Sequence, residues 1–235
     1  MQLVIRDLCS WYGQAQVLYD LNIHVDQGEV VGVLGRNGAG KTTLLRSIAG
    51  LQSRVTGDVI FDGTSILGHS AHSIALRGLT LVREGGRMAN SLTVRQGLIL
   101  GQRLARGRKV TARSLEEIWQ LFPLLEPLRD RRAGLLSGGQ RQALALAIAF
   151  IAQPRLLLLD EPSAGLSPPV ARDMFRTIAR LASDGMPILV VEQHPAWLVG
   201  IAKRGYFLEV GKIANEGPIQ GPAKDEETST IASVT

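Results

Sequence analysis

The sequence predicts an α/β fold with a mainly parallel sheet, an antiparallel β portion near the N-terminus and an inserted helical subdomain. The first observation is an apolar run over residues 30–34, which leads into a glycine-rich segment and then into a helical pattern over 42–49. The second is a long helical pattern over 168–183, which lies between two further apolar segments. Segments that are apolar throughout are typical of parallel strands with helices on both faces. The three such segments are 30–34, 156–159 and 188–191.

The regions around these apolar segments indicate how the chain is divided into a core and a helical subdomain. Period-two alternation over 21–25, together with the apolar-rich segment 3–8, predicts the antiparallel portion, and 57–63 is expected to form a hairpin-like segment. From about 71 to 150 the pattern is helical and more polar, with prolines at 123 and 127. We therefore expect one domain, with a core over about 1–84 and 151–217, a helical subdomain over about 85–150 and a flexible tail over 218–235.

Composition excludes several classes of protein. The 235 residues are 45% hydrophobic, but the longest apolar run, 143–152, is far short of the ~20 residues that a membrane-spanning helix requires. No signal peptide is recognisable, and the single cysteine, Cys9, is typical of a protein in a reducing cytoplasm. Basic residues cluster over 103–113 without interleaved aromatic residues, which favours a solvated face over a nucleic-acid surface.

Residues 35–42 read Gly-Arg-Asn-Gly-Ala-Gly-Lys-Thr and fit the phosphate-binding pattern G-x-x-x-x-G-K-[ST]. The glycines allow successive backbone N–H groups to surround a β-phosphate, and the helix that follows directs its positive end there. Lys41 is expected to bridge the β- and γ-phosphates, and the Thr42 hydroxyl to bind Mg²⁺. The expected nucleotide-binding residues of this segment are Gly35, Arg36, Asn37, Gly38, Ala39, Gly40, Lys41, Thr42 and Thr43.

An acidic pair follows four consecutive leucines. Asp160 therefore emerges from the end of a buried strand, where its carboxylate is expected to hold Mg²⁺ directly or through water. Glu161 stands next to it.

A second motif, Leu-Ser-Gly-Gly-Gln over 136–140, offers a hydroxyl and backbone N–H groups at a helix N-terminus. One chain has no evident use for two anion-binding sites unless two chains close face to face over ATP.

The order of these motifs resembles the ATP-binding cassette ATPases, and the resemblance covers nearly the whole chain. It implies a P-loop NTPase core that hydrolyses ATP, with Glu161 as the general base for the attacking water. It further implies that the Leu-Ser-Gly-Gly-Gln motif completes the nucleotide site of a partner cassette. The residues that would do so are Ser137, Gly138, Gly139 and Gln140. An aromatic residue near the N-terminus should stack on adenine. Tyr12, with Val17 beside it, matches by position, and Trp11 is the alternative.

Three positions depart from the commonest pattern of that family. Glu84 stands where many cassettes have a glutamine that contacts Mg²⁺ and the membrane partner. Gln193 stands where many have a histidine that contacts the γ-phosphate, although a shift of one residue would bring His194 there instead. Ser167 replaces a common aspartate. These departures resemble the LivF-type cassettes of branched-chain amino acid importers and the related urea importers, whereas Arg83 differs from that pattern.

The resemblance implies an ATP-hydrolysing, energy-coupling subunit of a membrane importer for branched-chain or other amino acids, with a urea or amide importer as the alternative. It implies separate transmembrane permeases, a second cassette chain in a homodimer or, as we favour, a heterodimer, and an extracytoplasmic substrate-binding protein. The expected location is the cytoplasmic face of the cell membrane. A soluble cassette acting on nucleic acid or ribosomes and a nucleotide-binding regulator without turnover are less favoured.

Overall fold

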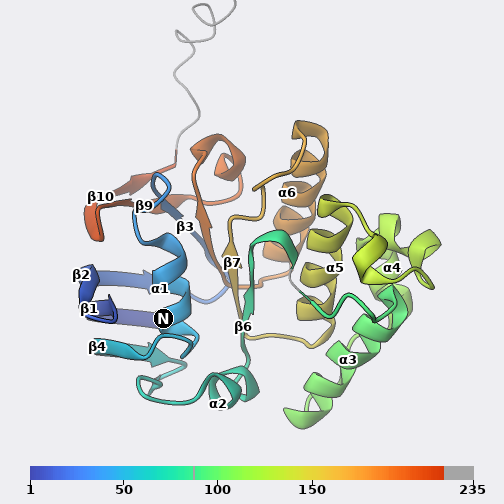
Figure 1. Cartoon of the computed structure of the whole chain (residues 1–235), viewed down its shortest axis with the longest axis horizontal. Coiled ribbons are helices and arrows are strands. Elements are labelled where there is room, and N and C mark those ends of the chain that lie inside the picture. The colour runs from blue at the N-terminus through green and yellow to red at the C-terminus, as the bar shows by residue number, and fades with distance from the viewer. Residues whose placement is uncertain (87, 220–235) are drawn as a thin grey trace, which may run out of the picture.

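A six-stranded sheet lies at the centre of the computed structural model, which describes residues 1–86 and 88–219. Its strand order is β10-β9-β3-β8-β7-β6, and only β10 runs antiparallel to its neighbour (Figure 1). The mainly parallel sheet is therefore confirmed. The tail predicted over 218–235 lies, from residue 220 onward, outside the described residues. The strands are β3 (Val30–Leu34), β6 (Leu79–Val82), β7 (Leu156–Asp160), β8 (Ile188–Glu192), β9 (Arg204–Glu209) and β10 (Lys212–Pro218).

A second, antiparallel sheet is formed by the N-terminal strands in the order β2-β1-β4-β5, which confirms the predicted antiparallel portion. The hairpin expected over 57–63 is only partly correct, because its turn lies at 62–63. Gly57 lies inside β4 with φ 97°, and a Cβ there would collide with the backbone of Asp7 where β1 bulges. The glycine marks a close approach of two strands instead of a turn. The strands are β1 (Leu3–Tyr12), β2 (Ala15–Val25), β4 (Arg54–Phe61) and β5 (Thr64–Ser65).

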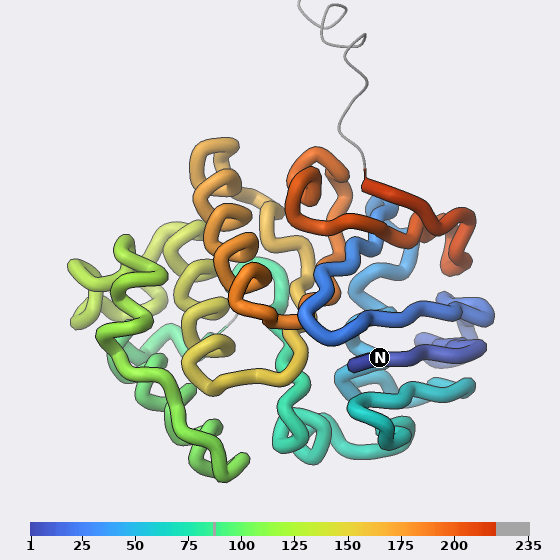
Figure 2. Tube along the Cα trace, turned by 180° about the vertical axis from the view of Figure 1, so that it is seen from behind, coloured from blue at the N-terminus to red at the C-terminus, as the bar shows by residue number. Residues whose placement is uncertain are grey.

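The helices fall into two groups (Figures 1 and 2). Helix α1 lies between the two sheets, whereas α3, α4 and α5 gather beyond the β6 edge of the large sheet, beside α6. The helices are α1 (Lys41–Ile48), α2 (Ala71–Leu76), α3 (Val94–Gly107), α4 (Leu115–Leu121), α5 (Gly138–Ile151) and α6 (Pro168–Ser183). Short 3₁₀ turns are η1 (Glu84–Gly86), η2 (Pro123–Leu128), η3 (Ala133–Leu135) and η4 (Pro195–Leu198).

Both faces of the large sheet are buried, as the apolar strand segments predict. Leu157 and Leu159 of β7 belong to one hydrophobic cluster with α5 and α6, while Leu156 and Leu158 belong to another with α1 and the antiparallel sheet. Side chains that alternate along a strand point to opposite faces, so an unbroken apolar strand fills two cores. The apolar run 143–152 falls mostly in α5, and within the described part of the chain no helix meets the length and hydropathy of a membrane span.

The sequence reasoning was wrong about one strand. The stretch from about 71 to 150 was expected to be helical, yet β6 lies within it and pairs in parallel with β7, from Leu79 opposite Leu156 to Val82 opposite Leu159. Four residues are too few for a helical or strand period to be distinguished in the sequence. The conformation of β6 is determined by its pairing with β7 at the sheet edge, which a local sequence pattern does not indicate.

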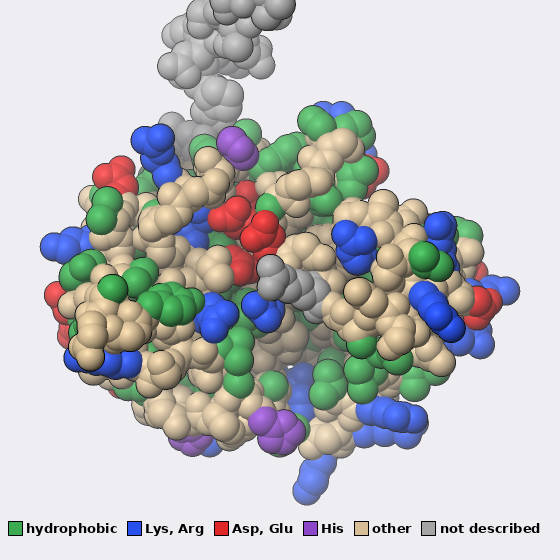
Figure 3. Space-filling view, viewed as in Figure 1, with side chains coloured by type: hydrophobic (Ala, Val, Ile, Leu, Met, Phe, Trp, Pro, Cys, Tyr) green, Lys and Arg blue, Asp and Glu red, His purple; other side chains and the backbone are tan. Residues whose placement is uncertain are grey.

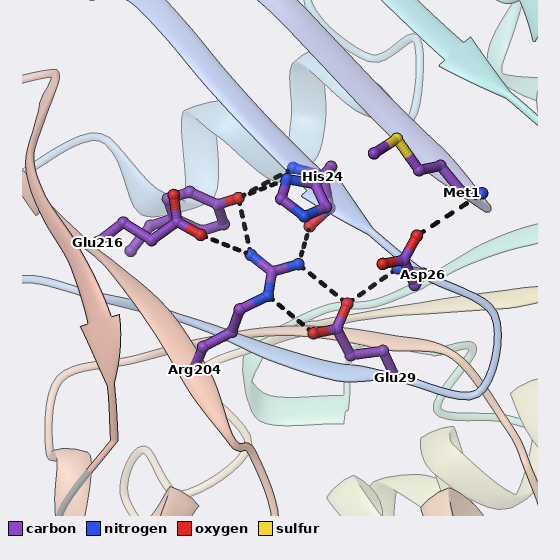
Figure 4. A network of polar contacts seen from close by, with 7 residues as sticks. Met1, His24, Asp26, Glu29, Arg204 and Glu216 are labelled. Carbon is purple, nitrogen blue, oxygen red and sulfur yellow. Dashed lines mark hydrogen bonds and ion pairs between the residues drawn. The ribbon is translucent and has the colours of Figure 1, made fainter.

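A polar network joins the two sheets (Figure 4). The Arg204 guanidinium of β9 donates to both carboxylate oxygens of Glu29, at 2.8 and 2.9 Å, and to the Tyr206 hydroxyl at 2.8 Å. It also donates to the backbone carbonyl of His24 in β2 at 2.9 Å and to Glu216 of β10 at 3.0 Å. Two-pronged pairing of an arginine with a carboxylate is among the stronger polar contacts in proteins. Arg204 therefore ties both sheets together.

Arg204→Ala is expected to lower the free energy of unfolding by about 2–4 kcal/mol, because Glu29 and Tyr206 lose their partner in a half-buried position. Burial alone would raise the pKa of Glu29, but hydrogen bonds from Arg204 and the Asp26 amide outweigh it and lower that pKa. The stabilisation should therefore be complete at neutral pH and disappear as the pH falls below about 4.5, the ordinary pKa of this group.

Chemical denaturation at several pH values measures this difference. The control is Arg176→Ala, since Arg176 pairs with Asp173 in an exposed position and should contribute less than about 0.5 kcal/mol. Equal effects of the two substitutions would contradict the structural role of Arg204.

Candidate nucleotide site

The glycine-rich segment forms a loop between β3 and α1. Helix α1 begins at Lys41, no side chain caps it, and its first turn holds no acidic residue. Its positive end is therefore available to an anion. Gly40 has φ 109°, and a Cβ there would lie 2.7 Å from Leu18 Cδ2, so the close contact with β2 requires glycine. The local structure is that of a phosphate-binding loop.

Lys41 is almost completely buried, with 3% of its surface exposed. Its Nζ donates to the backbone carbonyls of Gly35, at 2.7 Å, and Arg36, at 3.1 Å. It also forms an ion pair with Glu161 Oε1 at 3.0 Å. The loop thus holds the ammonium group at its own opening, opposite a carboxylate from the end of β7.

Glu161 adopts a left-handed backbone conformation with φ 43°. Such a conformation costs a non-glycine residue about 1–3 kcal/mol and occurs often at functional sites. The Glu161 N–H donates to the carbonyl of Val191 in β8 at 3.1 Å, which holds the turn in place. This turn directs a carboxylate that is 17% exposed toward Lys41.

The Thr42 hydroxyl donates to Asp160 Oδ1 at 3.0 Å. Burial raises the pKa of Asp160, the carboxylates of Glu161 and Glu84 raise it further, and the Thr42 hydrogen bond and Lys41 oppose the rise. Hydroxyl and carboxylate oxygens are the ligands that Mg²⁺ prefers, and in phosphate sites it takes its remaining ligands from water and phosphate. Across residues 1–86 and 88–219 no group of three His, Cys, Asp or Glu side chains could hold a metal by itself. The three predicted ligands, Thr42, Asp160 and Glu84, offer hydroxyl and carboxylate oxygens, so their chemistry fits Mg²⁺.

A cleft of about 690 Å³ opens beside Thr42, Glu84 and Glu161. Acidic side chains gather near the middle of the face seen in Figure 3, and three carboxylates line the cleft. Gln193 and His194 both line it as well, directly after β8, so both alternatives for the γ-phosphate contact stay open. The lining residues are Asn37, Gly38, Thr42, Glu84, Glu161, Ser163, Ala164, Gly165, Leu166, Pro168, Glu192, Gln193, His194 and Trp197.

Other predicted residues of the loop lie deeper. Ala39 and Thr43 are buried, and Thr43 accepts a hydrogen bond from Ser47 through its carbonyl. Val17 is half-buried beside the loop, with its Cγ1 3.7 Å from where a Cβ on Gly40 would be. Val17 therefore lies where contact with a nucleotide bound at the loop is feasible.

The two candidate adenine-stacking residues differ in their surroundings. The Tyr12 side chain is 49% exposed at the end of β1. The guanidinium of Arg54 lies 4.6 Å from the centre of the Trp11 ring and covers one face of it. An aromatic ring needs a free face to stack on a base. This difference favours Tyr12.

Tyr12→Ala is expected to raise the Kd for ATP at least about fivefold, because stacking of a base on an aromatic ring contributes about 1–3 kcal/mol. The turnover number should change little, since the ring lies away from the reacting phosphates. Titration with a fluorescent nucleotide measures the affinity, and Tyr12→Trp should restore it. A larger loss of affinity in Trp11→Ala than in Tyr12→Ala would assign stacking to Trp11.

The second motif lies at the start of α5, in a different hollow. Ser137 accepts from the Gln140 N–H at 3.3 Å, and Gln140 Oε1 accepts from the Ser137 N–H at 2.9 Å, which forms a capping box. Ser137, Gly139 and Gln140 line a hollow of about 480 Å³ with residues of α6. Within the described residues, none of the four from Ser137 to Gln140 lines the cleft over the phosphate loop. One chain therefore carries two separate candidate anion sites.

Two residues of the cleft were missed by the sequence reasoning. Glu192 ends β8 and is 1% exposed, and Ser163 follows two residues after Glu161. A glutamate at the carboxyl end of an otherwise apolar strand is the signal that could have found Glu192, since buried acidic residues require partners.

A glycine loop between a parallel strand and a helix, with a buried lysine facing a strand-end acidic pair, defines a P-loop ATPase. The model of the ABC transporter family matches residues 18–164, more than half of the chain. The chain belongs to the ABC transporter family, as an ATPase subunit.

Relatives and solved structures agree over most of the chain. The branched-chain amino acid transport ATP-binding protein BraG of Pseudomonas aeruginosa is 35% identical, with 87% of each chain covered. The lipopolysaccharide export ATP-binding protein LptB of Escherichia coli is 30% identical, with 97% of this chain and 95% of LptB covered. The ADP conformation of the cassette MJ1267 superposes with a TM-score of 0.78 at 25% identity and covers 92% of this chain and 90% of that one.

Proposed function

We propose that this chain is the ATP-hydrolysing, energy-coupling subunit of an ABC importer for branched-chain or other amino acids. The main observation that supports this proposal is the pair of separate candidate anion sites, one at α1 beside Lys41 and one at α5 beside Ser137. The solute class is supported by BraG and by LivF of Archaeoglobus fulgidus, named as a probable branched-chain amino acid transport ATP-binding protein, which is 33% identical with 89% of each chain covered. The similarity to LptB, an export protein, makes the direction of transport part of the proposal.

The residues in and around the cleft have different roles in hydrolysis. The N–H groups at the start of α1 and the Lys41 ammonium bind the phosphates and stabilise charge on the γ-phosphate. Glu161 accepts a proton from the attacking water, and Gln193 or His194 orients the γ-phosphate. Mg²⁺ held by Thr42, Asp160 and Glu84, when bound, adds electrostatic stabilisation of the phosphate oxygens.

ATP binding must rearrange the Lys41 contacts, because the ammonium is engaged by two carbonyls and Glu161. A second cassette chain would cover the nucleotide through its own Ser137–Gln140 segment. Two such chains, identical or related, close in a face-to-face dimer with two nucleotides between them. Hydrolysis removes the γ-phosphate contacts and lets the dimer open.

The membrane partner has a candidate docking groove. A hollow of about 370 Å³ reaches Arg83, the residue before Glu84, and is lined mainly by apolar residues of α2, β6, α3 and α5. The surface is hollowed below the acidic cluster in Figure 3. Exposed Leu76 and Leu104 line it, together with Arg83. A short permease helix bound here would be joined to the cleft through η1, so that movement of Glu84 reaches the permease.

Uptake measurements test this proposal. Cells that lack this chain should lose ATP-dependent uptake of radiolabelled leucine, isoleucine and valine, and regain it with the wild-type chain but not with Lys41→Ala. Loss of urea or amide uptake alone would instead support the alternative importer. Unchanged uptake of every one of these solutes would contradict import.

A soluble ATPase acting on nucleic acid or ribosomes is the less favoured alternative. Two members of the basic cluster over 103–113 have structural partners: Arg108 donates to the Ala152 carbonyl at 2.9 Å, and Arg113 lies 4.2 Å over the Phe150 ring. Side chains engaged in this way contribute little to a nucleic-acid surface. This observation supports transport over the alternative.

A further inference from the structure

The buried residue Glu192 contacts three segments of the nucleotide site, two through its carboxylate and one through its backbone carbonyl. Glu192 Oε1 accepts from the Ser163 N–H at 2.9 Å, and Glu192 Oε2 accepts from the Ser163 hydroxyl at 2.9 Å. Oε2 also accepts from the N–H of Gln193 at 3.1 Å. The backbone carbonyl of Glu192 accepts from the N–H of Gly35, the first residue of the phosphate loop, at 3.3 Å.

These contacts join elements that the chain separates widely. Ser163 belongs to the turn that begins at Glu161, where Ala164 N–H donates to the Glu161 carbonyl at 3.0 Å. Gln193 follows Glu192 directly. Because Glu192 is 1% exposed, its side chain can satisfy its charge only through these neighbours. A buried carboxylate that accepts three hydrogen bonds fixes the distance between the groups that donate them.

We propose that Glu192 is a positioning residue for ATP hydrolysis, whose carboxylate holds the Glu161 turn and Gln193 in a fixed relative position. This rests on the proposed roles of Glu161 and Gln193 in the cleft. Hydrolysis requires the general base and the γ-phosphate contact to meet the same phosphoryl group, and a misplacement of about 1 Å can cost a hundredfold in rate. Phosphate binding depends mainly on Lys41 and the start of α1, neither of which Glu192 contacts through its side chain.

Glu192→Gln keeps the size of the side chain but changes its hydrogen bonding. One carboxylate oxygen becomes an NH₂ group, which cannot accept and faces an N–H donor from Ser163 or Gln193. The turnover number should fall at least about tenfold, while the Kd for ATP stays within about threefold of the wild type. Steady-state hydrolysis and nucleotide titration of the full chain measure the two quantities separately.

Ser163→Ala provides a milder change, because it removes only the hydroxyl and leaves the backbone N–H. Its turnover number should fall about two- to threefold, and the double variant should be no slower than Glu192→Gln alone, because both changes remove the same contact. Where Glu192→Gln does not fold, a lower turnover number with unchanged Kd in Ser163→Ala still supports the proposal, and wild-type turnover there overturns it.

The matched control is Glu29→Gln, which disrupts the network of Arg204 (Figure 4). Neither Glu29 nor Arg204 lines the cleft. It should lower the melting temperature and leave the turnover number of the folded protein unchanged. Wild-type turnover in Glu192→Gln, or independent effects of the two substitutions in the double variant, overturns the positioning role. Full turnover in Glu161→Gln would instead overturn the assignment of the general base on which the proposal rests.

Discussion

Lys41→Ala is expected to abolish ATP hydrolysis and to weaken ATP binding by about a hundredfold or more. The ammonium group lies at the opening of the phosphate loop, held by the carbonyls of Gly35 and Arg36 and by Glu161. Hydrogen bonds to charged groups contribute about 1.5–3 kcal/mol each, so the loss of two phosphate contacts amounts to about 3–6 kcal/mol. Calorimetric titration with ATP and a phosphate-release assay measure the two effects.

Lys203→Ala is the control for this change, because Lys203 is exposed and lies away from the cleft. Its binding and hydrolysis should match the wild type. Circular dichroism should show that Lys41→Ala keeps the secondary structure, since the substitution leaves Glu161 partly accessible to water. Wild-type turnover in a folded Lys41→Ala variant would refute the phosphate-site assignment.

Glu161→Gln is expected to lower the turnover number by about 10²–10⁴-fold, the range that general acid–base catalysis contributes. ATP binding should persist or tighten, because the neutral amide no longer forms an ion pair with Lys41, which spans 3.0 Å in the wild type. With binding intact and hydrolysis blocked, an ATP-bound dimer should accumulate. Size-exclusion chromatography with and without ATP detects it.

Glu116→Gln is the matched control, since Glu116 is exposed on α4. It should hydrolyse ATP at the wild-type rate and show no ATP-dependent change in elution. A Glu161→Gln variant that stays monomeric in ATP and keeps full turnover would rule out the general-base role.

Much of the fold could be predicted because it is encoded locally. The three all-apolar segments form β3, β7 and β8, and the helix expected over 168–183 is α6 with the same bounds. Strand β6 and the position of Gly57 could not be predicted. Strand β6 forms because it pairs with β7, and Gly57 lies inside a strand because it faces a bulge in β1. In both cases the partner strand lies far away in the sequence.

The candidate site shows the same division. The sequence indicated Lys41 and Thr42, because their motif fixes both residue type and spacing. It indicated Asp160 by the apolar segment that precedes it, and Glu161 by the family resemblance. It could not indicate that Lys41 faces Glu161 or that Thr42 donates to Asp160, since those contacts cross 118 or more positions of the chain. Glu192 and Ser163 were missed for the same reason. Their contact joins β8 to the turn after β7 and belongs to no short motif.

The most direct test of the account is to purify this chain from its source membranes and identify its stable partners. The chain carries a tag and is extracted in a mild detergent. The account predicts two hydrophobic permeases and a second cassette chain in fixed proportion, and Leu104→Glu, in the apolar groove, should lose the permeases. Ribosomal proteins or nucleic acid in place of any membrane protein would contradict the transport function and leave only the ATPase.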